Sequence, residues 1–94
     1  MVELLHRFKR TYPDGSIEQC VIWEVPKSQS QPEGIRYRLA YIPAGADSPA
    51  VLYDNHHPKG HHKHIRGVES AYDFVDWRKL IEDFEKDKGA HENL

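Results

Sequence analysis

The chain has 94 residues, enough for one small domain with a single modest core. Hydrophobic residues make up 38% and charged residues 30%, which is typical of a globular protein and excludes a chain disordered throughout. The net charge is -2 with histidines neutral, so the chain as a whole does not attract nucleic acid or an anionic membrane. Any basic binding surface must therefore be local.

The predicted elements begin with strands, in the order 2–12, 17–25, 35–42, 50–55 and a further candidate at 62–66. In the first strand we expect Leu4, His6 and Phe8 to share one side. Asp14-Gly15 supplies a tight reversal into the second strand, so these two form a hairpin.

The end of the chain predicts one amphipathic helix. Its apolar residues recur at helical spacing, at Trp77, Leu80, Ile81 and Phe84. Asp76 suits the N-cap, and Val75 with Leu80 would form a hydrophobic staple. Gly89 is the expected stop, so residues 1–89 form the domain and 90–94 a disordered tail.

The fold class expected from these elements is α+β. We predict a single antiparallel sheet of four or five strands with the C-terminal helix packed on one face. One helix cannot cover both faces, so the other face is left to solvent, a ligand or a partner.

The candidate functional residues centre on "YDNHHPKGHHKH", residues 53–64, which holds five of the seven histidines. His62 and His64 would project to one side of a strand, as in many metal sites, and Asp54 could add a carboxylate. Lys59 and Lys63 would repel a divalent cation, however. We therefore predict no native metal site and no cofactor.

Phosphate is the second ligand that this region suggests. Gly60 would let a backbone N–H approach an anion, and Lys59 lies beside it. If the sheet brings its basic residues to one surface, four cations line that surface, namely Arg7, Lys9, Arg36 and Arg38. Histidine acid and base groups beside such cations are sufficient for metal-independent RNA cleavage. The alternative is that the arginines are solvated or paired with Glu18 and Glu24.

Several segments together resemble the TumE-like family of bacterial toxins. They are "LLHRFKRTYPDGSIEQCVIWEVP", "YRLAYI", "YDN", "KGHHKHIRG" and "YDFVDWRKLIEDF". The family pattern falls on Tyr53, Asp54, Asn55, Lys59, Gly60, His62, His64, Gly67, Glu69, Tyr72 and Phe74. His61 stands where we expect an acidic residue in relatives. The resemblance implies the toxin of a toxin–antitoxin pair, with a helix-turn-helix antitoxin as partner and a ribonuclease as the activity class.

These observations give one functional hypothesis and one alternative. In the first, a cytoplasmic toxin acts on RNA, with His62, His64 and Asp54 as catalytic residues. The expected substrate-binding residues are Tyr53, Lys59, Arg36 and Arg38. In the alternative, the open sheet face is a non-catalytic module that binds protein or nucleic acid. A homodimer is compatible with either hypothesis, and no segment suggests a membrane span or a signal peptide.

Overall fold

A computed structural model describes residues 2–56 and 59–92 as one antiparallel sheet and one helix. The elements are β1 (Glu3–Thr11), β2 (Ile17–Glu24), β3 (Ile35–Ile42), β4 (Val51–Asp54), β5 (His62–Ile65), β6 (Val68–Ala71) and α1 (Trp77–Glu92). The strands lie in the sheet in the order of the chain, as a meander. The predicted α+β class with one helix on one antiparallel sheet is confirmed. The predicted number of four or five strands is wrong, because the sheet has six.

The additional strand is β6, which pairs with β5 across a two-residue turn. Arg66 and Gly67 form this turn with φ angles of 51° and 81°, as a type I′ hairpin requires. The usual sequence signal for that turn is Asn-Gly or Asp-Gly. Here Arg66 stands in place of the Asn or Asp, so the sequence did not indicate the turn. All four residues of β6 are exposed, so the strand also lacks an alternating apolar pattern.

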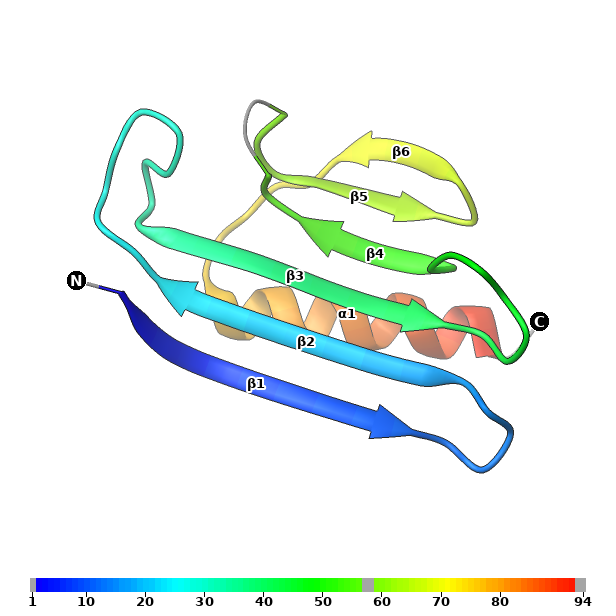
Figure 1. The fold of residues 1–94 in the computed structure, drawn as a ribbon. Coiled ribbons are helices and arrows are strands. Elements are labelled where there is room, and N and C mark those ends of the chain that lie inside the picture. The colour runs from blue at the N-terminus through cyan, green and yellow to red at the C-terminus, as the bar shows by residue number, and fades with distance from the viewer. Residues whose placement is uncertain (1, 57–58, 93–94) are drawn as a thin grey trace.

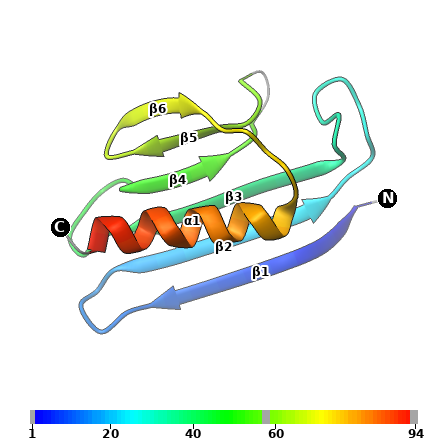
Figure 2. The same ribbon diagram turned by 180° about the vertical axis from the view of Figure 1, so that it is seen from behind.

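The helix covers only one face of the sheet. Figures 1 and 2 show α1 lying behind the sheet in one view and in front of it in the other, across the middle strands. Its buried side chains, Leu80 and Phe84, are fully enclosed against the inward residues of the sheet. Those inward residues include Cys20, Ile22, Tyr37, Leu39, Tyr41, Val51 and Tyr53. We call the other side of the sheet the open face.

A bulge changes the expected alternation in β1. Its register with β2 shifts between Leu4 and His6, so that Leu4 pairs with Trp23 and His6 with Ile22. Leu4 therefore shares the open face with Trp23, and the prediction that it lies on the side of His6 is wrong. Leu5, the extra residue of the bulge, packs against the core instead.

The ends of α1 match the sequence in part. The Lys79 backbone N–H donates to Asp76 Oδ1 at 2.8 Å, so the predicted N-cap is confirmed. Val75 is 66% exposed, and the predicted staple with Leu80 is wrong. The helix also continues through Gly89 to Glu92, so the predicted stop is wrong and residues 90–92 are helical. Residues 93–94 lie outside the described residues.

Within residues 2–56 and 59–92, no helix has the length and apolar character that crossing a membrane requires.

A buried ionic cluster joins the β1–β2 hairpin to α1. Glu18 is 1% exposed, and its Oε1 accepts from Lys88 Nζ at 2.6 Å and from the Tyr12 hydroxyl at 2.7 Å. Burial opposes the charge on Glu18, but hydrogen bonds from Glu85, Lys88 and Tyr12 outweigh it and lower its pKa. Burial and the bond to Glu18 raise the pKa of Glu85. The cluster therefore fixes the helix over the sheet.

Removal of the Lys88 ammonium should strand the Glu18 charge in the core. We expect Lys88→Met to lower the free energy of unfolding by roughly 3–5 kcal/mol, measured by urea denaturation. Lys79→Met is the matched control, because Lys79 and Asp83 form a more exposed i,i+4 pair on the same helix. It should cost about 1 kcal/mol or less. Glu18→Gln combined with Lys88→Met should recover much of the loss. Equal losses for Lys88→Met and Lys79→Met would contradict this role.

Candidate functional site

The strand register collects the candidate site residues on the open face. Directly paired residues of antiparallel strands project to the same face. One row of paired residues crosses all six strands, in the order Arg7, Val21, Arg38, Asp54, His62 and Ala71. The next row crosses all six, in the order Lys9, Gln19, Ala40, Leu52, His64 and Glu69. The basic residues and the histidines thus share one surface.

His62 is held by two acceptors. Its Nδ1 lies 2.8 Å from the Gly60 carbonyl oxygen, and its Nε2 lies 2.8 Å from Asp54 Oδ1. A carbonyl oxygen and a carboxylate only accept, so this arrangement suits an imidazole with a hydrogen on each nitrogen. The residue is 7% exposed. The two contacts therefore fix the orientation of the His62 ring.

His64 lies beside His62 and is more accessible. The two rings meet edge to face, with their centroids 5.1 Å apart. The side chain of His64 is 28% exposed, and its Nε2 lies 3.3 Å from Glu69 Oε1. The same oxygen accepts from Lys59 Nζ at 2.7 Å. That hydrogen bond lowers the pKa of Glu69, so the carboxylate stays ionised beside His64.

The family pattern includes Glu69, but the sequence did not place it among the expected catalytic or substrate-binding residues. It reaches His64 only because β6 turns back along β5, where Glu69 and His64 are direct partners. The signal that could have found it is the Arg66-Gly67 turn, which sets that pairing.

Asn55 also belongs to the family pattern, but the sequence did not predict its role, which is to position the start of β3. It is 3% exposed. Its Oδ1 accepts the Tyr37 backbone N–H at 3.0 Å, and its Nδ2 donates to the Ile35 carbonyl at 2.6 Å. Arg36 lies between these two anchored residues. A small hollow on the open side joins Arg36 and Arg38 to Asp54 and its neighbours.

The structure does not bring Tyr53 to this surface. Its ring lies on the helix face, is 1% exposed and packs edge to face against Phe84. Its hydroxyl donates to Asp87, which also accepts from Lys63 at 3.2 Å. The helix thus covers the side chain that we expected to bind substrate. We assign Tyr53 to the core and not to the site.

His61 also faces away from the cluster. Its ring stacks on Phe74, with centroids 4.7 Å apart. Its Nδ1 lies 2.8 Å from the Tyr37 hydroxyl, and its Nε2 lies 3.0 Å from Glu33. The hydrogen bond between His61 and Glu33 lowers the pKa of Glu33, while burial raises the pKa of Tyr37. The arrangement fastens the turn before β5 to β3 and to the segment before the helix.

Three side chains of the cluster are of the types that bind metal ions in proteins. The donor atoms of His62, His64 and Glu69 all lie within 4.8 Å of one another. The sequence-based expectation of no metal considered Asp54 as the nearby carboxylate. It did not include Glu69, which also lies near the histidines. Both nitrogens of His62 already have partners, however, and Glu69 is paired with Lys59. A cation would have to displace these contacts.

We predict that tag-free purified protein carries no stoichiometric zinc. The measurement is elemental analysis, followed by a thermal melt with and without EDTA. The variant His62→Ala/His64→Ala should show the same metal content as the unmodified chain. Structural zinc supplies a large part of the folding free energy of a small domain. One zinc per chain, with a large drop in melting temperature in EDTA, would identify the cluster as a metal centre and contradict the prediction.

The comparisons with known proteins agree with the resemblance seen in the sequence. A family model described as "Toxin TumE" matches residues 4–92. A search of curated proteins finds no match, and a search of solved structures finds none either. The family match spans most of the chain, including every strand but the first residue of β1. The chain therefore belongs to the TumE family of toxins.

Proposed function

We propose that this toxin cleaves RNA without a metal ion, at the cluster of His62, His64, Asp54 and Lys59. Membership of the family makes the chain a toxin component, for which an antitoxin partner is implied. We further propose that the antitoxin is a helix-turn-helix protein and that the pair acts in the cytoplasm. The observation that carries the proposal is the pair of adjacent imidazoles on the cationic open face.

The proposed reaction is an internal transfer at one phosphate. The RNA 2′-hydroxyl loses its proton to His64 and attacks the adjacent phosphorus. The bond from phosphorus to the 5′ oxygen breaks, and His62 gives that oxygen a proton. The products are a 2′,3′-cyclic phosphate and a 5′-hydroxyl, so no external water or oxidant is consumed. His64 suits the base role because it is the more exposed imidazole.

The other residues of the cluster have supporting roles in this proposal. Asp54 orients His62 and balances the positive charge of its protonated ring, which the 2.8 Å contact supports. Lys59 and Arg38 supply positive charge for the phosphate as negative charge develops on its oxygens. The side chain of Lys59 is 59% exposed, so it can leave Glu69 for a substrate phosphate.

One observation favours the non-catalytic alternative. Both nitrogens of His62 are already hydrogen-bonded within the protein, as a purely structural histidine would be. In that case the open face binds RNA or a protein partner and leaves its bonds intact. The two functions differ in a direct assay, since only the first consumes RNA.

The test is an RNA-cleavage assay on purified protein in EDTA. We expect cleavage by the unmodified chain and a loss of at least about a hundredfold in His62→Ala/His64→Ala, because each acid or base group typically contributes 10²–10⁴-fold. His6→Ala is the matched control, because His6 lies on the helix face beside Trp77. Induction of the same three proteins in bacteria without antitoxin should arrest growth in the first and third only. Equal cleavage by the double variant would remove the catalytic assignment.

A further inference from the structure

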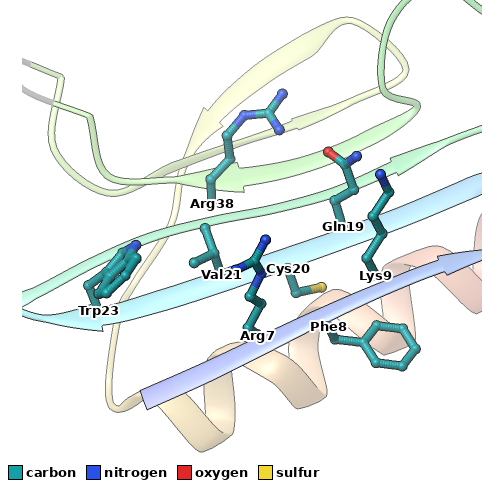
Figure 3. Close-up of a pocket in the computed structure, with 8 residues that line it drawn as sticks. All are labelled: Arg7, Phe8, Lys9, Gln19, Cys20, Val21, Trp23 and Arg38. Atoms are coloured by element: carbon teal, nitrogen blue, oxygen red, sulfur yellow. The ribbon is translucent and has the colours of Figure 1, made fainter. Parts of the chain in front are cut away.

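The open face carries an aromatic side chain among its cations. Trp23 lies on β2 and pairs directly with Arg36 on β3. Two adjoining hollows of about 410 and 390 Å³ meet at Val21, Trp23 and Arg38. Figure 3 shows the first hollow, with the cationic side chains standing on the side of the sheet away from the helix. Its open-face lining consists of Arg7, Lys9, Gln19, Val21, Trp23 and Arg38.

Within the described part of the chain, these cations are not neutralised by carboxylates. Among residues 2–56 and 59–92, no carboxylate lies within ion-pair distance of Arg7, Lys9, Arg36 or Arg38. The partners that the sequence offered lie elsewhere. Glu18 is buried on the helix side with Lys88, and Glu24 pairs with the inward residue Ile35. Asp54 is the acidic residue of the row, and His62 holds it.

We propose that the open face binds single-stranded RNA, with one base stacked on Trp23 and the adjoining phosphates on Arg36 and Arg38. The choice of RNA rests on the proposed function. A tryptophan can stack on a base only when that base is not already stacked in a duplex, so the site selects single strands. The four cations, which have no carboxylate partner among the described residues, complement the phosphate backbone in charge.

The geometry also gives the bound RNA a path across the sheet, from Trp23 to the histidines. Trp23 lies on β2 and His62 on β5, three strand spacings or roughly 14 Å apart across the sheet. Arg38 stands between them, directly paired with Val21 on one side and with Asp54 on the other. An RNA chain that runs across these residues places a phosphate at the histidines, a few nucleotides from the base on Trp23.

The test measures binding without cleavage, so its failure is distinct from failure of the proposed reaction. The background is Trp77→Phe, which leaves Trp23 as the single tryptophan. The probe is a 2′-O-methyl RNA oligonucleotide of mixed sequence, which has no free 2′-hydroxyl to attack. We expect saturable quenching of Trp23 fluorescence by the single strand, and at least tenfold weaker binding of the same sequence as a duplex.

Variants then separate stacking from charge. Binding to the variants is measured with a labelled oligonucleotide. Trp23→Ala should weaken binding roughly tenfold or more, whereas Trp23→Phe should retain most of the affinity. Arg36→Ala should make the slope of log K against log salt shallower, by about the amount that one phosphate contact contributes. Phe8→Ala is the control, because Phe8 is an exposed aromatic residue of the same hairpin whose ring lies on the helix side. It should bind as the unmodified chain does.

Three outcomes would overturn the proposal. The first is an absence of quenching, and the second is equal affinity of folded Trp23→Ala and the unmodified chain, with folding checked by circular dichroism. The third is loss of antitoxin binding in Trp23→Ala and Trp23→Phe with unchanged RNA affinity, which would make this face a protein-docking surface. Quenching by the single strand, together with the expected order of the variants, would support it.

Discussion

The arrangement of this protein depends on one constraint, which is that a single helix covers a single face of a six-stranded sheet. Successive side chains of a strand point to opposite faces, so each strand contributes one set to the core and one to the open face. On the covered side, Leu80 and Phe84 are fully enclosed. On the open side, the meander register sets arginines, an aspartate and histidines in rows. The same periodicity that builds the core therefore builds the candidate site.

Ionic contacts differ between the two faces in a way that supports this division. On the helix side, Glu18 and Lys88 form a buried pair, which costs desolvation and is retained where both charges are fully hydrogen-bonded. On the open side, Arg36 and Arg38 have no carboxylate partner within the described part of the chain. Uncompensated charge on a sheet face is a poor contribution to stability, but it is what an anionic ligand requires. The charge of the open face is therefore one of the observations that support the proposed function.

Much of this fold follows from local sequence patterns. The β-branched and aromatic residues of 17–25 predicted β2, alternation predicted β3, and helical spacing predicted the apolar side of α1. Asp76 was identified as the N-cap from its position alone. The errors occurred where a local rule was overridden. Gly89 continues the helix, and the short polar strand β6 has neither apolar alternation nor a standard turn sequence.

The candidate site was predictable only in part, for a related reason. His62 and His64 share a face because they are two residues apart on a strand, which the sequence shows. Their partners come from other strands, so the contacts of Asp54 and Glu69 depend on register and could not be read from spacing. Tyr53 adjoins Asp54 in the sequence and was grouped with it. Alternation places its ring on the opposite face, under the helix.

The central claim is that two imidazoles on the open face transfer protons during metal-independent cleavage of RNA. The most direct measurement is the chemistry of the new RNA ends after cleavage by purified protein in EDTA, determined by mass spectrometry of a short single-stranded substrate. The account predicts 2′,3′-cyclic phosphate and 5′-hydroxyl ends, because attack comes from the neighbouring 2′-hydroxyl and His62 protonates the leaving oxygen. Ends with 3′-hydroxyl and 5′-phosphate, formed only when a divalent metal is restored, would show that an activated water is the nucleophile and would contradict the account.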